Sequence, residues 1–208
     1  MARKLAVASM VMGAIVLMAG PSAAQIDAPA ETAAFQGRVN QYVQMHRRVE
    51  GPLPPLKVTT DMDEVHRLMA DLRRRIREER ARQAQEPLVT PPMALVLRQV
   101  IGTTLTVDDL VDLSAELDEH APEGMPAPRV NEPLPEDAPR VLIAPQLLRA
   151  LPRLPHELRY MALSKALLIW DHHADLVVEM VPGLFDPLTY SKKKTLEAHE
   201  TGRPQRRE

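Results

Sequence analysis

The spacing of apolar residues changes along this chain, and this change constrains the fold more than any other feature. Up to residue 119, apolar residues recur every three or four positions, which is the period of an amphipathic helix. After Pro155 they come in short runs separated by polar breaks, which is typical of strands. Residues 121–155 between them contain nine prolines and neither period. The sequence therefore predicts an α+β fold whose helical region and small sheet are joined by a proline-rich connector.

The helical region, residues 25–120, is expected to contain four helices. The first, over residues 31–50, has one buried face. That face consists of Phe35, Val39, Tyr42, Val43, His46 and Val49. A second helix with a narrow apolar seam begins after the capping residue Asp61, and the short proline-rich segment before it predicts an antiparallel helical hairpin. Two further helices are expected to start after Thr90 and Thr106.

The connector is assigned to residues 121–156. An apolar segment within it, residues 141–150, predicts a short strand and then a helical turn that begins near Pro145. Residues 157–183 predict a three-stranded antiparallel meander. Its strands are expected at residues 158–163, 166–170 and 176–181. The polar residues 184–208 predict a disordered tail.

The first 24 residues have the layout of an export signal. Two basic residues precede an apolar run, and the small residues Ser22 and Ala24 follow it, so we expect cleavage between Ala24 and Gln25. An uncleaved anchor is the alternative, but the apolar run is shorter than a bilayer-spanning helix. The mature protein is therefore expected in the periplasm or the medium, without stable membrane insertion.

The composition excludes several kinds of function. The chain has no cysteine, which rules out disulfides, thiol catalysis and thiolate metal ligands. Loss of the signal leaves 24 basic against 28 acidic residues, a charge that disfavours nucleic-acid binding. Six arginines between Arg73 and Arg82 could form a patch for phosphate, anionic lipid or an acidic partner. We favour a solvated helix end, in which these arginines pair with neighbouring glutamates.

One local cluster has the composition of a metal site. His172 and His173 are flanked by Asp171, Asp175 and Glu179. Imidazole and carboxylate ligands suit zinc, nickel and similar divalent ions, so His172, His173 and Asp175 are the candidate ligands, with Glu179 a further one. Adjacent histidines in a strand or tight turn point to opposite sides, and a polar hairpin turn is the alternative interpretation.

Other titratable residues are less informative. His46 and His66 lie on the two predicted hairpin helices, where either could meet the other or Glu50, or could simply pack at the interface. The chain has no Gly-x-Ser-x-Gly turn, no glycine-rich loop and no His-Glu-x-x-His motif. No catalytic residue and no cofactor are therefore assigned.

Two resemblances extend this interpretation. Residues 35–56, 154–160 and 167–178 resemble a family of uncharacterised exported bacterial proteins, which implies export but no particular activity. The closing meander is similar to the end of periplasmic nickel/cobalt-homeostasis proteins, where a short strand pair follows a proline-led entry. Ser164 and Lys165 stand where glycine or aspartate is expected there, and no set of metal ligands carries over.

Together these features predict an exported, non-enzymatic binding or structural module of the cell envelope, with a protein partner in that compartment. A periplasmic protein that binds or senses divalent metal is the first alternative. A hydrolase whose site forms only in the fold, with His46, His66 or His156 beside a carboxylate, is the second.

Overall fold

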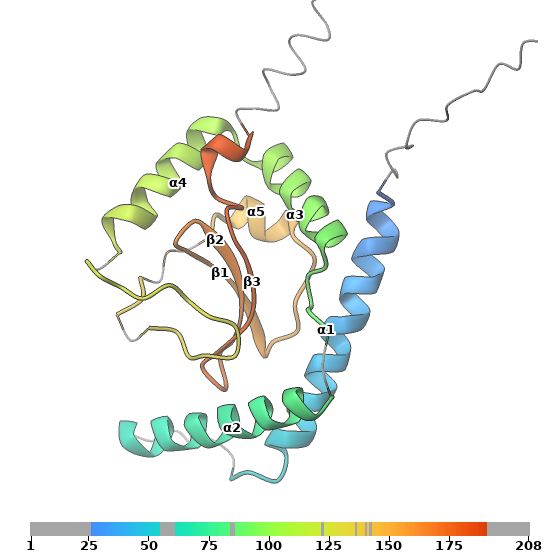
Figure 1. Ribbon diagram of the computed structural model, residues 1–208, viewed down its shortest axis with the longest axis vertical. Coiled ribbons are helices and arrows are strands. Elements are labelled where there is room, and N and C mark those ends of the chain that lie inside the picture. Colours follow the sequence, from blue (N-terminus) through green and yellow to red (C-terminus); the bar gives the residue numbers. More distant parts are fainter. Residues whose placement is uncertain are drawn as a thin grey trace, which may run out of the picture.

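The structure is a computed structural model that describes residues 26–54, 61–83, 86–121, 123–135, 137–139, 141 and 143–190. The expected export signal and residues 191–208 lie outside this set. The elements are α1 (Ala28–Glu50), α2 (Met62–Gln83), α3 (Pro91–Thr104), α4 (Val107–Glu119), α5 (Pro145–Ala150), β1 (Leu158–Leu163), β2 (Ala166–Asp171) and β3 (Leu176–Val181) (Figure 1). The predicted α+β fold with a C-terminal meander is confirmed.

The three strands form an antiparallel sheet in the order β1-β2-β3. The helices and the later part of the connector, including Ile143 and Leu147, pack on one face, and the earlier part of the connector, including Met125 and Leu134, packs on the other. Residues such as Ala162, Leu167 and Ile169 pack into the main core with α1 and α3. Alternate residues such as Leu168 pack with Leu134 of the connector in a second, smaller core. The period of two along each strand therefore gives the sheet two buried faces.

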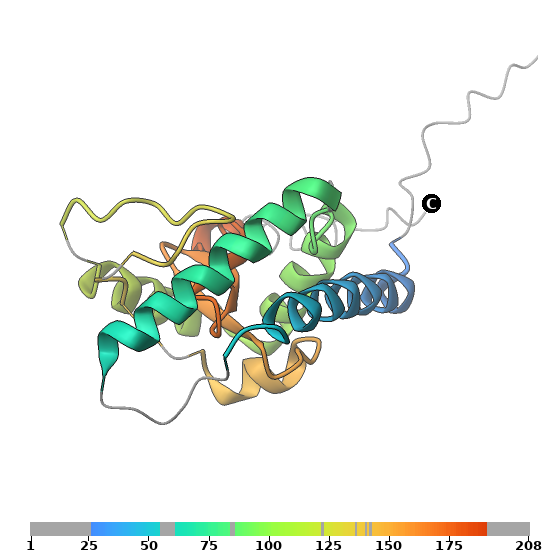
Figure 2. The ribbon, with the colours of Figure 1, turned by 90° about the horizontal axis from the view of Figure 1, so that it is seen from below.

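The helices α1 and α2 form an open hairpin. They are in contact, and Figures 1 and 2 show α2 crossing α1 rather than lying alongside it. Of the seam predicted for α2 (Met62, Val65, Met69, Leu72 and Ile76), only Leu72 and Ile76 are buried, and Met62 is exposed. Among the described residues, no helix is long and apolar enough to cross a membrane.

The predicted helix starts after Asp61, Thr90 and Thr106 are confirmed by their capping bonds, whereas α1 begins at Ala28, before the predicted residue 31. The N–H of Glu64 donates to Asp61 Oδ1 at 3.1 Å, and that of Met93 to Thr90 Oγ1 at 3.4 Å. Thr106 and Asp109 form a reciprocal capping box at the start of α4. Because each bond satisfies an otherwise unpaired N–H, each contributes about 1 kcal/mol.

A bulge between β2 and β3 sets the position of a buried carboxylate. Ile169 pairs with Glu179 and Trp170 pairs with Val177, so Val178 is an extra residue. Glu179 thus lies opposite Ile169, on the face that packs against the helices. There its Oε2 accepts the N–H of Val89 at 3.2 Å, which ties the segment before α3 to the sheet.

The predicted start of the disordered tail at residue 184 is wrong. Leu184 and Phe185 are fully buried, and residues 187–190 form a helical turn. Gly183 has a φ of +67°, a conformation that favours glycine, and the chain turns there toward the core. The N–H of Phe185 then donates to the carbonyl of Lys165 at 3.0 Å. The domain therefore includes residues 184–190, which were assigned to the tail.

The turn between β1 and β2 offers a test of this meander. Ser164 and Lys165 both have positive φ, +48° and +61°, as in a two-residue type I′ turn that favours Asn-Gly. We expect the double substitution Ser164→Asn, Lys165→Gly to raise the free energy of unfolding by about 1 kcal/mol in urea denaturation. Ser164→Val, which is strained at positive φ, should lower it. Equal stability of all three proteins would contradict the turn geometry.

Candidate functional site

The buried face of α1 ends in polar residues. Tyr42 and His46 are fully buried, and Glu50, one turn further on, has 34% of its side chain exposed. They follow Phe35 and Val39 at helical spacing and therefore share the same face. The face that packs on the sheet thus presents a phenol, an imidazole and a carboxylate at its C-terminal end.

Asp171, the last residue of β2, meets this polar end. It lies two residues after Ile169 on the helix-facing side of the sheet and is fully buried. Its Oδ2 accepts the Tyr42 hydroxyl at 2.7 Å and lies 2.6 Å from His46 Nδ1. Its Oδ1 accepts the backbone N–H groups of His173 and Ala174, each at 3.1 Å. Asp171 therefore joins α1 to the turn between β2 and β3, and its buried charge is fully hydrogen-bonded.

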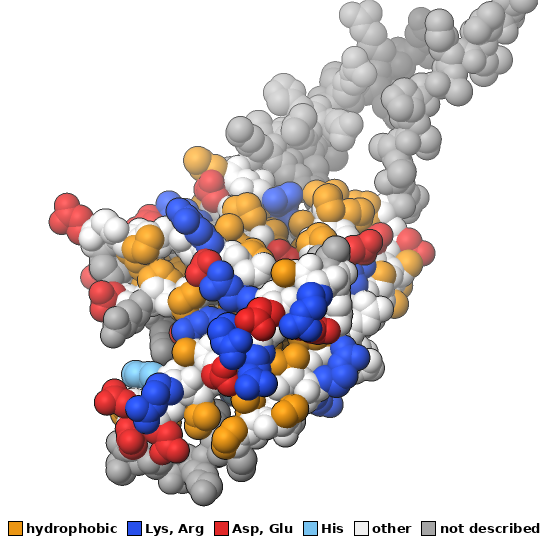
Figure 3. Space-filling view, turned by 60° about the horizontal axis from the view of Figure 1, so that its bottom comes forward, with side chains coloured by type: hydrophobic (Ala, Val, Ile, Leu, Met, Phe, Trp, Pro, Cys, Tyr) orange, Lys and Arg blue, Asp and Glu red, His pale blue; other side chains and the backbone are white. Residues whose placement is uncertain are grey.

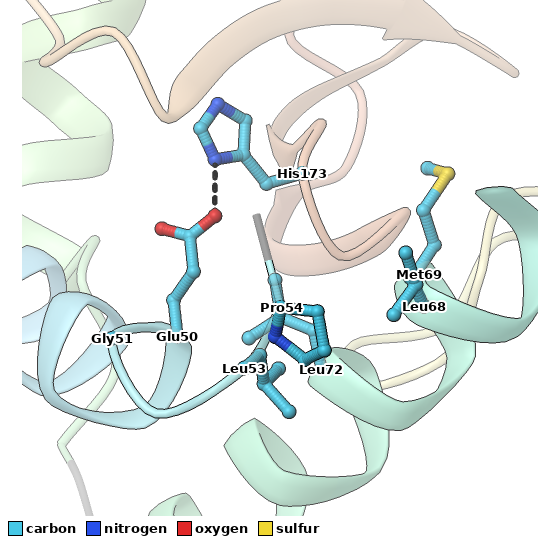
Figure 4. A pocket seen from close by; sticks show the side chains of 8 residues that line it. All are labelled: Glu50, Gly51, Leu53, Pro54, Leu68, Met69, Leu72 and His173. Atoms are coloured by element: carbon cyan, nitrogen blue, oxygen red, sulfur yellow. Dashed lines mark hydrogen bonds and ion pairs between the residues drawn. The ribbon is translucent and has the colours of Figure 1, made fainter. Parts of the chain in front are cut away.

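The same turn brings His173 to Glu50. Nδ1 of His173 lies 3.0 Å from Oε1 of Glu50 (Figure 4), and the other oxygen, Oε2, lies 3.0 Å from His46 Nε2. One potential ligand atom from each of His46, Glu50 and His173 falls within a cluster 4.8 Å across. Two imidazoles and one carboxylate therefore converge from α1 and the turn.

The electrostatics of the cluster set its protonation. Burial alone would lower the pKa of His46, but its hydrogen bond to Asp171 and the charges of Asp171 and Glu50 raise that pKa above its usual value. Burial, reinforced by the charge of Asp171, raises the pKa of Tyr42 well above its usual value. Tyr42 is therefore a neutral donor, and His46 favours the protonated form between two carboxylates.

The geometry also suits a divalent ion. With His46 Nδ1–H bonded to Asp171, Nε2 can serve as a ligand when an ion displaces its proton, and this carboxylate–histidine arrangement commonly orients metal-bound histidines. With bonds of about 2.0–2.2 Å, ligand atoms around a tetrahedral ion lie roughly 3.3 Å apart. Glu50 Oε2 and His46 Nε2 are already 3.0 Å apart. The three ligand atoms lie within 4.8 Å of one another, so an ion could bind once the side chains draw closer together.

Of the predicted ligands His172, His173 and Asp175, His173 belongs to this cluster. The ring of His172 lies 4.6 Å from that of His173, but its Nε2 donates to the carbonyl of His156 at 2.6 Å. Burial lowers the pKa of His172. In the described structure, His172 therefore holds the β2–β3 turn against the backbone of His156.

Asp175 and Glu179 have other partners. Asp175 accepts Trp170 Nε1–H at 3.2 Å through one oxygen and faces Arg73 at 3.2 Å through the other. Glu179 binds the N–H of Val89. Within the described part of the chain, neither carboxylate belongs to the cluster of His46, Glu50 and His173.

Sequence reasoning identified the key residues of α1 only partly. The sequence predicts a contact of His46 or His66 with the other or with Glu50 across the two helices, whereas the contact that forms joins His46 to Glu50 within α1. His66 is exposed and lies outside the cluster. The sequence indicates Asp171 only as a residue that flanks the two histidines. Its position in the alternating pattern of the strand could have identified it, because Leu167, Ile169 and Asp171 all point to the same, buried face.

Two arginines hold the surrounding elements in place. Arg47 Nε donates to Glu157 Oε1 at 2.6 Å, and although burial alone would raise the pKa of Glu157, the bond to Arg47 helps lower it. Arg80 of α2 donates to the carbonyl of Val178 at 3.2 Å, and its guanidinium lies 5.5 Å from the centre of the Tyr42 ring. These contacts fix β1, β3 and α2 around the polar end of α1.

The arginine-rich part of α2 is largely paired. Arg74 bonds to Asp71 and Glu78, and Arg82 to Glu79. Figure 3 shows basic and acidic side chains interleaved on this face of the molecule. The interleaved charges favour the solvated helix over a basic patch.

A cavity of about 350 Å³ opens beside the cluster. Glu50 and His173 lie on one side of it, and aliphatic residues lie across from them (Figure 4). The aliphatic wall consists of Leu53, Pro54, Leu68, Met69 and Leu72. The more exposed members of the cluster therefore face a largely apolar space.

Comparison with protein-family models, curated proteins and solved structures found no match for this chain. The assignment of a function therefore rests on the geometry of the described residues.

The raised pKa of His46 leads to a prediction about stability and pH. Because the folded pKa lies above the unfolded value of about 6.5, the protonated ring stabilises the fold fully below that pH. This contribution is lost as the pH rises through the folded pKa. With EDTA present to remove metal ions, we expect NMR titration to place the pKa of His46 above 6.5. The substitution Glu50→Gln should lower this pKa, because it removes a neighbouring negative charge.

Urea unfolding provides the matching measurement. The stability advantage of the wild type over Glu50→Gln should shrink as the pH rises through the pKa of His46, while His66→Gln should leave the pH dependence unchanged. A wild-type His46 that titrates below 6.5 would contradict the network of Asp171, His46 and Glu50.

Proposed function

We propose that this protein is an exported divalent-metal-binding protein whose ligands are His46, Glu50 and His173. The observation that carries the proposal is the hydrogen bond between buried Asp171 and His46 Nδ1, which directs Nε2 toward Glu50. Histidines that bind metal are commonly held through their other nitrogen by a carboxylate in this way. This proposal takes up the metal alternative of the sequence analysis, with a ligand set that spans two elements.

The donor set restricts the kind of metal. Two imidazole nitrogens and one carboxylate suit zinc, nickel and copper, whereas calcium and magnesium prefer oxygen ligands throughout. The ligands come from one helix and one tight turn that Asp171 holds together. Such rigid support lowers the cost of ordering the ligands when an ion binds.

Calorimetric titration of zinc into metal-free protein at pH 7.5 tests the proposal. We expect one ion per chain, and a loss of affinity of about 100-fold or more in each of His46→Gln, Glu50→Gln and His173→Gln, since each removes a ligand. His172→Gln and His66→Gln are matched controls and should bind zinc like the wild type. Asp171→Asn should weaken binding by about 10- to 100-fold.

The variants must be folded, which circular dichroism and urea unfolding establish. Absence of zinc, nickel and copper binding in the wild type would overturn the proposal. Equal affinity in the three ligand variants and the two controls would also do so. The cluster would then be a hydrogen-bonded network that serves only stability.

The proposal of export rests on the first 24 residues, with their basic start, apolar run and small residues before Gln25. The intact mass of the protein from the envelope fraction of a bacterial host should correspond to a chain that begins at Gln25. Ala24→Trp should block cleavage and leave the longer precursor, because the peptidase requires a small residue there. A full-length wild-type protein in the cytoplasm would contradict export.

A further inference from the structure

The cluster of His46, Glu50 and His173 supplies three ligands. Among the described residues, no fourth histidine or carboxylate joins it. Structural zinc sites usually have four protein ligands, whereas sites that act on or bind small molecules keep one position open. An ion at this cluster would therefore have a position for a further ligand.

The exposure of the three residues indicates where that position lies. His46 is fully buried, whereas 34% of the Glu50 side chain and 23% of the His173 side chain are exposed. The cavity of about 350 Å³ is lined by Glu50 and His173 but not by His46. The open position therefore faces the cavity, away from Asp171 and the core.

The cavity wall indicates what kind of molecule fits. Across from Glu50 and His173, the wall consists of the aliphatic residues of the α1–α2 segment and α2. Leu72 is buried, and Leu53, Leu68 and Met69 are partly buried. Partly exposed aliphatic side chains around a concavity gain stability when an apolar group covers them. The volume matches the small-molecule range.

We propose that the metal site binds a small molecule with an anionic oxygen head group, such as a carboxylate, and an aliphatic body of several carbons. The head group occupies the open position of the ion, and the body lies against Leu53, Leu68, Met69 and Leu72. This inference rests on the proposed metal-binding function and adds the class of ligand.

Calorimetry on the zinc-loaded protein tests the inference with acetohydroxamate and octanohydroxamate as probes. The two share a zinc-binding head group and differ by six methylenes. Each buried methylene strengthens binding about fourfold, and part of the chain fits the cavity, so we expect octanohydroxamate to bind at least about 30-fold more tightly.

Two variants separate the cavity from the metal. The double substitution Leu68→Gln, Met69→Gln makes the wall polar. It should reduce the preference for octanohydroxamate over acetohydroxamate to less than about fivefold and leave the zinc affinity unchanged. Leu148→Gln alters an exposed leucine in a different cavity and should retain the wild-type preference.

The outcomes distinguish the two proposals. If zinc binds but both probes bind equally, the ligand inference is overturned and the metal function stands. Equal binding of octanohydroxamate to the metal-free protein would also overturn it, because the head group would not be on the ion. If zinc does not bind at all, the metal function itself fails.

Discussion

The rest of this structure depends on the hydrogen bonds of one buried carboxylate, Asp171. A charge removed from water costs several kcal/mol unless its oxygens are fully paired. Tyr42 and His46 of α1 supply two partners, and the backbone of the β2–β3 turn supplies the others. The same bonds that make this burial tolerable also hold the helix and the turn in one relative position. Stability of the fold and geometry of the candidate site therefore have a common source.

This arrangement produces a gradient of exposure across the cluster. Asp171 and His46 are fully buried, whereas Glu50 and His173 reach the cavity. Asp171 orients His46 from the buried side, and Glu50 and His173 are the members of the cluster that reach solvent. A rigid inner layer behind accessible ligands is the arrangement that a pre-organised binding site requires. The bulge that places Glu179 and the contact between Arg80 and Tyr42 brace the same region from β3 and α2.

Local patterns predicted much of the fold and one residue of the site. The capping residue Thr106 was sufficient to locate the start of α4, and the lengths of the apolar runs after Pro155 were sufficient to locate the three strands. Helix starts and strands are encoded by residues close together in the sequence. The predicted start of the tail at residue 184 was wrong because Leu184 and Phe185 belong to no periodic apolar pattern. Only the turn at Gly183 brings them to the core. His173 was identified by composition alone, which could not separate it from His172.

The sequence by itself determined the α+β class, the apolar face of α1 that ends in His46, and the turn that carries His173. Its lack of cysteine also determined that no metal site in this chain can use a thiolate ligand. Only the tertiary structure decided that this face packs against Asp171 and that Glu50 meets His173. His46 and Asp171 are separated by 125 positions in the sequence, and Glu50 and His173 by 123 positions. Periodicity reports which face of an element is buried, whereas the partner of that face is chosen by the packing of the whole chain.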